Sequence, residues 1–286
     1  MSSEEKRGMF NSSKTRVYPA FKKLCENPNG IDEFLKWLTE VGVRLPKCGK
    51  VNPNDVYFDG HQGERGFYPS EILLEWLISE KCIESGLARM TKDMPREGLL
   101  SETAKKRALL FSPIKEQRSK VRSSIKMPIN PQEKAWYVLE GATKPDVTIE
   151  TDTYILVIEG KRTEPHLTDS TTWMKHRDQM IRHLDGVYEY VRKENLQKKV
   201  FGLFIIAERD DVAFTKYKRP IPNYKMCKYG GGKYRRGSGK SCWEESLPHR
   251  SPAERAKMKD GFIGFVTWAD IKKRWSDIEY PEVVND

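Results

Sequence analysis

Long hydrophobic runs are missing from this sequence of 286 residues. The longest apolar stretches, Tyr154 to Ile158 and Phe201 to Ala207, fall far short of the roughly 20 residues that a helix needs to cross a bilayer. The residues MSSEEKRGMF at the start also lack the apolar segment of a signal peptide. We therefore expect a soluble, cytoplasmic protein with no membrane partner.

Paired cysteines are missing too. The five cysteines are odd in number and widely scattered, and no two of them form a CxxC pair. Disulfide frameworks and zinc knuckles show recognisable cysteine spacings. Cys227, Cys242 and His249 match no common metal-ligand spacing, so we expect reduced thiols.

Charge is abundant, and most of the net positive charge lies in one segment. The chain has 51 Lys and Arg against 41 Asp and Glu, which gives a net charge of +10. Nine basic residues, four tyrosines and no acidic residue lie between Phe214 and Lys240. Basic side chains on phosphates release counterions, and tyrosines stack on bases. This segment predicts a polyanionic partner such as DNA.

The first half of the chain contains helix signals separated by loops. Apolar residues at helical spacing predict a helix over Ile31 to Val43. Residues 51–66 are rich in Gly, Asn and Asp, which is typical of a loop. Ser70 is a good N-cap for a helix over Glu71 to Cys82, and a further helix is expected over 102–110.

Strand signals gather in the second half. Three candidates, 135–139, 146–150 and 154–158, follow one another closely. A helix over Thr172 to Arg192 and a buried strand over Phe201 to Ala207 come next. A further strand and a closing helix are expected at 261–268 and 270–275. The order of helix, three strands, helix and strand predicts an α/β sandwich with a mixed sheet.

The residues that carry chemistry lie at the ends of two of these strands. Asp146 opens one strand, and Glu159-Gly160-Lys161 closes the next one after an apolar run. Because side chains alternate along a strand, Glu159 and Lys161 should share one face. Pairing of the two strands would bring Asp146 beside Glu159.

Two carboxylates and a carbonyl are suitable ligands for Mg²⁺, a hard ion that keeps several waters. Such an ion polarises a phosphate and lowers the pKa of a bound water. A lysine beside that water can orient it or stabilise the charge of the transition state. A buried lysine also needs a partner, which the neighbouring carboxylates would supply.

Pro145-Asp146 followed by Glu159-Gly160-Lys161 resembles the PD-(D/E)xK motif of restriction-endonuclease-like nucleases. The resemblance covers roughly residues 135 to 207 and an upstream helix. It implies the αβββαβ core of that family, with a mixed sheet flanked by helices. It also implies that Asp146, Glu159 and the Gly160 carbonyl bind Mg²⁺ or Mn²⁺, and that Lys161 assists the attacking water.

The resemblance extends to two helices. The family often has a glutamate on its first core helix, here about 70–82, and Glu71 is favoured over Glu75 for this metal ligand. Some exonuclease-like branches place a Gln and a Tyr four residues apart on the later helix. This chain has Gln179 but His183, so that branch is not supported, although Gln179 stays a catalytic candidate near the metal.

The expected organisation is a mostly helical region at 1–130, which includes the first core helix, and a nuclease core at 131–286. The core contains a basic insertion at 209–250. GGGKYRRGSGKS within it is not a phosphate-binding P-loop, because Tyr234 stands where the first glycine should be. The predicted DNA-binding residues of the insertion are Lys218, Arg219, Lys233, Arg235, Arg236 and Lys240.

These features predict a metal-dependent deoxyribonuclease, an endonuclease in restriction, defence or repair. One alternative is a DNA-binding module on the same fold that does not cut, although all three motif residues are present. Another is cleavage of structured RNA. A homodimer stays open, because many nucleases of this family cut as dimers and the sequence shows no interface.

Overall fold

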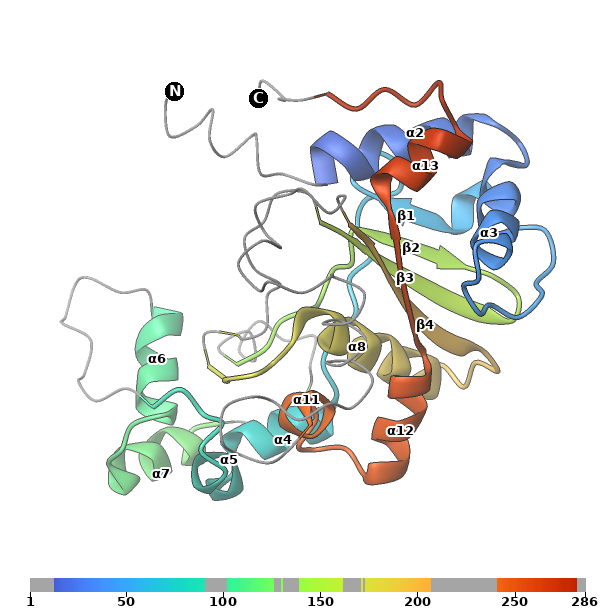
Figure 1. Cartoon of the computed structure of the whole chain (residues 1–286). Coiled ribbons are helices and arrows are strands. Elements are labelled where there is room, and N and C mark those ends of the chain that lie inside the picture. The colour runs from blue at the N-terminus through green and yellow to red at the C-terminus, as the bar shows by residue number, and fades with distance from the viewer. Residues whose placement is uncertain are drawn as a thin grey trace.

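A five-stranded mixed sheet forms the centre of the computed structural model, which describes residues 13–90, 102–125, 130, 139–161, 171, 173–206 and 241–281 (Figure 1). The strands lie side by side in sequence order. β1, β2 and β3 are antiparallel, whereas β3, β4 and β5 are parallel. Their bounds are β1 Val56–Phe58, β2 Val147–Glu150, β3 Tyr154–Gly160, β4 Lys199–Ile206 and β5 Phe262–Thr267.

Four of these strands agree closely with the prediction, but β1 does not. It lies within the stretch 51–66 that the composition assigned to a loop, after the short 3-10 helix η2 (Pro53–Asp55). The predicted strand at 135–139 falls almost wholly on residues 131–138, which lie outside the described residues, and Leu139 is in a turn. The strand that pairs with the outer edge of β2 therefore comes from the N-terminal part of the chain.

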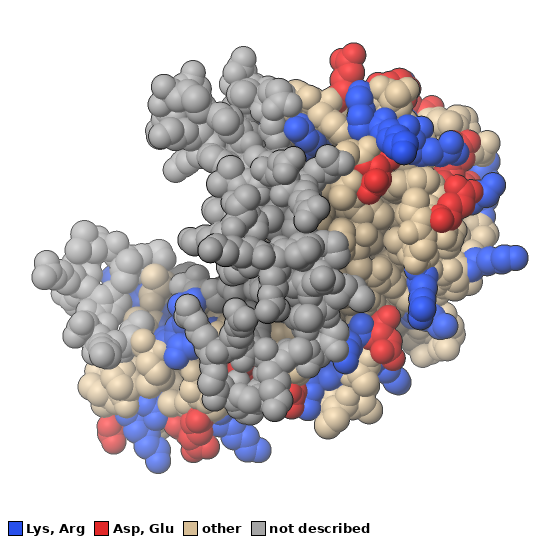
Figure 2. Space-filling model, viewed as in Figure 1, with Lys and Arg blue, Asp and Glu red and all other residues tan. Residues whose placement is uncertain are grey.

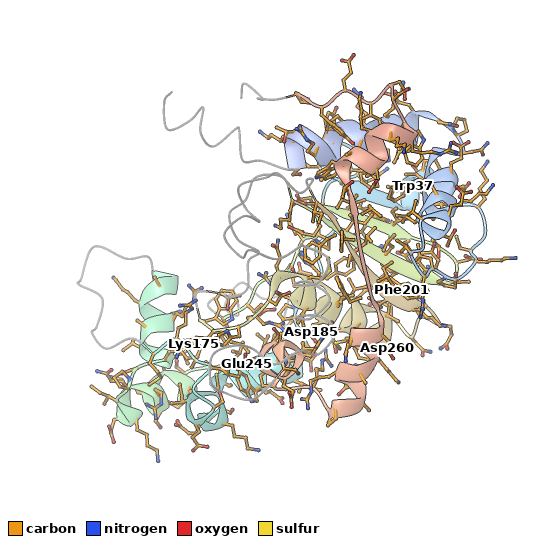
Figure 3. The ribbon with its side chains drawn as sticks, viewed as in Figure 1. Trp37, Lys175, Asp185, Phe201, Glu245 and Asp260 are labelled. Carbon is orange, nitrogen blue, oxygen red and sulfur yellow. The ribbon has the colours of Figure 1, made fainter. Side chains whose placement is uncertain are left out.

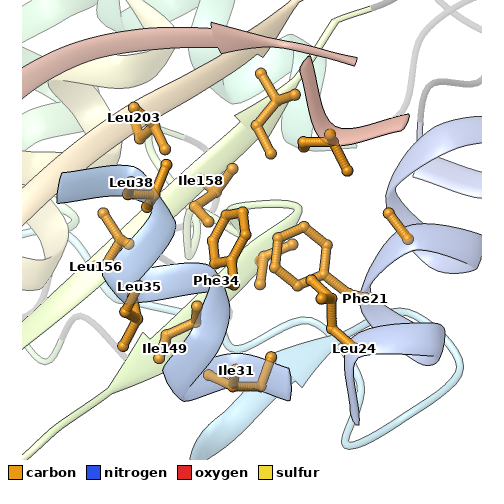
Figure 4. Close-up of a cluster of buried hydrophobic side chains, with 14 of the residues drawn as sticks. Phe21, Leu24, Ile31, Phe34, Leu35, Leu38, Ile149, Leu156, Ile158 and Leu203 are labelled. Atoms are coloured by element: carbon orange, nitrogen blue, oxygen red, sulfur yellow. The ribbon is translucent and has the colours of Figure 1, made fainter. Parts of the chain in front are cut away.

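One face of the sheet is covered by helices from both ends of the chain. These are the π-helix η1 (Ser13–Val17), α2 (Tyr18–Glu26), α3 (Gly30–Glu40) and α13 (Trp268–Arg274). Phe21 and Phe34 pack with Ile149, Leu156 and other apolar strand residues in the largest buried cluster (Figure 4). The apolar spacing of α3 predicted this face correctly.

The same face joins the first and last described segments. Arg16 Nη1 donates to the carbonyl of Pro281 at 3.0 Å. The rings of Trp37 and Trp275 meet edge to face with centroids 5.3 Å apart, and Phe34 lies 6.1 Å from Trp275. Helices α2 and α13 accordingly lie side by side in Figure 1. The core of this face is complete only when residues near both ends are in place.

The opposite face is covered by α8 (Gln179–Lys193), with α11 (Cys242–Ser246) and α12 (Pro252–Asp260) packed against it. Ile155 and Val157 of β3 face this layer. The helix begins at Gln179 rather than at Thr172, because the Asp178 side chain caps it by accepting from the Ile181 N–H. Ser251 and Glu254 start α12 with a capping box.

A buried ion network fixes α8 to α11 and α12. Arg177 donates twice to Glu140, at 2.8 and 3.0 Å, and once to Asp185 at 2.8 Å. Arg250 donates to Asp185 at 2.8 Å and to Glu189 at 3.0 Å. Asp185 lies in the interior of the layer, where α8 meets α11 (Figure 3). We use the name buried ion network for Glu140, Arg177, Asp185, Glu189 and Arg250.

A separate group of helices, the helical lobe, stands away from the sheet at the lower left of Figure 1. It consists of α4 (Glu71–Ile78), α5 (Glu80–Glu84), α6 (Glu102–Leu110) and α7 (Lys115–Ser123). Leu73, Leu74, Leu77, Leu110 and Phe111 belong to its own buried cluster. Arg118 and Arg122 of α7 both pair with Glu80.

This arrangement corrects two predictions. The helix expected over 71–82 is broken at Ser79, whose ψ of 156° is extended, although Ser70 caps its start as expected. The helix α4 is not the first core helix, because its apolar side packs in the helical lobe and α2 and α3 cover the sheet instead. Among the described residues before 130, η1, α2, α3 and β1 pack with the sheet, whereas α4 to α7 form the helical lobe.

Surface charge is mixed wherever the described side chains are visible. Lys and Arg alternate with Asp and Glu over the upper right and over the helical lobe at the lower left (Figure 2). Among the described residues, no helix is both long enough and apolar enough to span a membrane.

Candidate functional site

Strand register brings the two predicted carboxylates together. Val147 pairs with Ile158 in the antiparallel β2–β3 ladder, so Asp146, which directly precedes β2, lies opposite Glu159 near the end of β3. The Gly160 N–H donates to Asp146 Oδ2 at 2.8 Å, which fixes the aspartate against the end of β3. The spacing of the motif was therefore a correct guide to this contact.

Glu159 and Lys161 point toward α8, as the alternation of β3 predicted. Their side chains are buried, with exposed fractions of 3% and 9%. Lys161 Nζ donates to Glu159 Oε1 at 2.8 Å and to Gln179 Oε1 at 3.1 Å. The Gln179 amide in turn donates to Glu159 Oε1 at 2.7 Å. We use the name carboxylate site for Asp146, Glu159, Lys161 and Gln179, all of which the sequence had singled out.

The structure adds two side chains to which the sequence gave no role. His183 lies one turn after Gln179, and its Nε2 is 3.1 Å from Glu159 Oε2. Its Nδ1 is 2.6 Å from Thr143 Oγ1. The spacing of four residues from Gln179 was the available signal for His183, because residues four apart share a helix face. No sequence pattern pointed to Thr143.

The two carboxylates have opposite electrostatic environments. Burial and the neighbouring Glu159 charge raise the pKa of Asp146 well above its usual value. Burial would also raise the pKa of Glu159, but donation from His183 and the Lys161 charge outweigh it and lower that pKa. The donors and the cation around Glu159 thus favour its charged form, whereas at Asp146 the Lys161 charge and the Gly160 N–H do not outweigh burial and the Glu159 charge.

Further acidic residues approach the same edge of the sheet. Phe58 pairs with Val147, so Asp59 follows β1 toward Asp146. The backbones of Phe67 and Thr143 exchange two hydrogen bonds of 2.8 and 2.9 Å, which brings the segment before Phe67 alongside. Burial and the charges of Asp59 and Glu159 raise the pKa of Glu64. Sequence reasoning missed Glu64 because it missed β1.

Glu71 does not join this site. It is exposed at the start of α4, while the apolar side of that helix packs within the helical lobe. Glu75 is exposed on the same helix. His176 lies before the start of α8 in a left-handed conformation with φ of 59°, so it does not share the helix face of Gln179. The predicted DNA-binding residues Lys218, Arg219, Lys233, Arg235, Arg236 and Lys240 lie outside the described residues.

The donor set of the carboxylate site suits a hard cation. Asp146 and Glu159 offer carboxylate oxygens, and the Gly160 N–H already faces Asp146, so the carbonyl of this extended residue points to the same side. Within the described ranges, no group of three or more His, Cys, Asp or Glu is arranged to hold a metal ion. Two carboxylates with water as the remaining ligands is a set that Mg²⁺ accepts and structural zinc does not.

Comparison of the chain with protein-family models, with curated proteins and with solved structures gave no match.

Proposed function

We propose that this protein is a metal-dependent deoxyribonuclease, an endonuclease that hydrolyses DNA phosphodiester bonds. The observation that carries the proposal is the position of Lys161, whose ammonium group is held by Glu159 and Gln179 at the strand end that also holds Asp146. Burial of an ammonium group and two carboxylates in one place costs free energy of folding, and such clusters are typical of functional sites.

The order of the elements supports the restriction-endonuclease-like part of the proposal. Helices α2 and α3 precede β1, and the helical lobe of α4 to α7 stands between β1 and β2 in the sequence. The antiparallel pair β2 and β3 is followed by α8 and then by β4, which is parallel to β3. With α4 to α7 treated as an insertion, this order is compatible with the αβββαβ core of the family whose motif the chain resembles. The first helix and strand come from other segments than the sequence suggested, and β5 extends the sheet.

Each residue of the carboxylate site would have a separate role in the hydrolysis. Asp146 and Glu159 would hold Mg²⁺ or Mn²⁺, which when bound polarises the phosphate and lowers the pKa of a water ligand. Lys161 lies where it can orient the attacking water or stabilise negative charge on the phosphate oxygens. The water oxygen forms the new bond to phosphorus, the bond to the leaving sugar oxygen breaks, and that oxygen takes a proton. Gln179 would hold the side chains of Lys161 and Glu159 in place through its hydrogen bonds to both.

DNA as the substrate is supported by the net charge of +10 and by the uninterrupted basic stretch from Phe214 to Lys240. Restriction, defence against foreign DNA and repair are all roles for such an activity. A homodimer would allow both strands to be cut at one site.

The decisive experiment incubates the protein with supercoiled plasmid and with linear duplex, in Mg²⁺, in Mn²⁺ and in chelator. Glu159→Gln and Asp146→Asn should each slow cleavage by about 100-fold or more, because they remove charge from the metal ligands. Asp152→Asn is the matched control, since Asp152 lies in the turn at the other end of β2 and β3 and accepts from the Gly49 N–H.

Nicking of the plasmid that needs metal and is lost only in the two site variants supports the nuclease. Digestion of linear duplex without plasmid nicking would indicate an exonuclease instead. DNA binding without cleavage under every metal condition would favour the DNA-binding module. Preferred cutting of a structured RNA would replace DNA as the substrate.

A further inference from the structure

Glu159 is held from both sides. Its Oε1 accepts from Lys161 and from Gln179, and its Oε2 lies against His183 Nε2 at 3.1 Å. Lys161 and Gln179 already have roles in the proposed reaction. His183 is buried, with 2% of its surface exposed. The His183 contact is therefore a support for the carboxylate rather than a part of the surface that substrate reaches.

Both ring nitrogens of His183 have a hydrogen-bond partner. Nε2 lies 3.1 Å from Glu159 Oε2, and Nδ1 lies 2.6 Å from Thr143 Oγ1. The two contacts together fix the plane of the ring, so Thr143 is linked through His183 to the Glu159 carboxylate.

Thr143 is itself fixed by the backbone. Its N–H and its C=O both bond to Phe67, at 2.8 and 2.9 Å, and its side chain is buried. The helix can approach this segment because Gly186, one turn after His183, has no side chain. A Cβ at Gly186 would lie 3.0 Å from Thr143 Cγ2 and 3.1 Å from Phe67 Cβ. Thr143, His183 and Gly186 together bring α8 to the distance at which the hydrogen bonds form.

We propose that His183 and Thr143 are positioning residues that hold the Glu159 carboxylate in the orientation needed to bind the metal ion. The inference rests on the proposed function, because it assigns these residues to the metal site of that function. Partners that orient a metal ligand change metal affinity or activity by about 10- to 100-fold when they are removed.

The test is Mn²⁺ affinity, measured by electron paramagnetic resonance on the intact chain and independent of any cleavage. His183→Leu and Thr143→Val remove the hydrogen bonds and should each weaken Mn²⁺ binding by about 10- to 100-fold. His183→Gln keeps an N–H near the position of Nε2, and Thr143→Ser keeps the hydroxyl, so these two should stay within about threefold of the wild type. A thermal unfolding midpoint for each variant checks that it is folded.

Weakened binding in the first pair with rescue in the second supports the proposal. Equal weakening in all four variants, or none in any, overturns it and assigns His183 a packing role. The two proposals fail differently. A wild-type protein that binds Mn²⁺ and cuts DNA, with unaffected His183 and Thr143 variants, loses only the positioning role. A wild-type protein without Mn²⁺ binding loses both.

Discussion

Helix α8 carries two buried clusters of charge, and they differ in whether their charges balance. In the buried ion network and the ion pairs directly beside it, four guanidinium groups pair with four carboxylates. The pairs are made by Arg177, Arg182, Arg192 and Arg250 with Glu140, Asp185, Glu189 and Glu254. In the carboxylate site, one ammonium group faces two carboxylates, with Glu64 and Asp59 nearby.

Two aspartates show the consequence. Burial disfavours the charge of both, but His249, Arg177 and Arg250 outweigh it at Asp185 and hold that pKa well below its usual value. At Asp146 burial and the charge of Glu159 act together, and the pKa rises. The cationic neighbours of Asp185 therefore compensate for its burial, whereas those of Asp146 do not. Under the proposed function, the metal ion would supply the missing positive charge at Asp146.

The largest expected effect concerns the balanced cluster. Arg177→Met should lower the free energy of unfolding by about 3–5 kcal/mol, because it leaves Glu140 and Asp185 buried without their main partner. Urea unfolding near neutral pH measures it. Arg192→Met is the control, since that side chain is 56% exposed and its pair with Glu189 is worth about 1 kcal/mol at most. Equal losses of unfolding free energy in the two variants would mean that burial does not determine how much these ion pairs contribute to stability.

An intermediate loss of stability is expected at Gly160, which lies between Glu159 and Lys161 of the carboxylate site. A Cβ at Gly160 would lie 2.6 Å from Val17 Cγ2 and 2.9 Å from Trp268 Cζ2. Gly160→Ala should therefore cost about 1–3 kcal/mol of stability and reduce cleavage, because the end of β3 must shift. Gly66→Ala is the control, because its nearest heavy atom would be at 3.5 Å, an ordinary contact. Full stability of Gly160→Ala would show that the strand end tolerates displacement.

The smallest expected effect is an increase in the free energy of unfolding rather than a decrease. Asp146→Asn should raise the free energy of unfolding at neutral pH by about 0.5–2 kcal/mol while it abolishes cleavage. The pKa of Asp146 is higher in the folded protein, so its ionisation lowers stability as pH rises through that range. The gain should shrink in acid, where the wild-type carboxyl is already protonated.

Asp185→Asn makes the comparison directly, because it is the same change at the other buried aspartate. The pKa of Asp185 is lower in the folded protein, so its contribution is present above the ordinary value of 3.8 and is lost as pH falls below it. We expect Asp185→Asn to destabilise the protein at neutral pH. Urea unfolding of both variants across the acid range checks the two signs, and the same sign for both would contradict the contrast between the clusters.

The sequence predicted the parts of the fold that have strong local patterns. Apolar runs marked β3 and β4, and the spacing of Asp146, Glu159 and Lys161 marked the site before any contact was known. The capping residue Ser70 placed the start of α4 correctly. In each case a few neighbouring residues carry the whole signal.

The rest depends on contacts between distant segments. The strand β1 has three residues and no period of its own, and it is a strand only because β2 offers a partner about 90 residues later. The prediction of Glu71 came from taking 70–82 as the first core helix, whereas in the structure Glu64 lies near Asp146. Thr143 could not be singled out either, because its task comes from His183 on another element.

The shared face of α3 and α13 has a consequence for synthesis on the ribosome. Phe34 and Trp37 are covered by Trp275, so they stay without this cover until α13 emerges, more than 220 residues after α3. At roughly 5–20 residues per second this delay is about 10 to 45 seconds. During this interval Phe34 and Trp37 of the nascent chain lack the ring of Trp275 that packs against them in the folded protein.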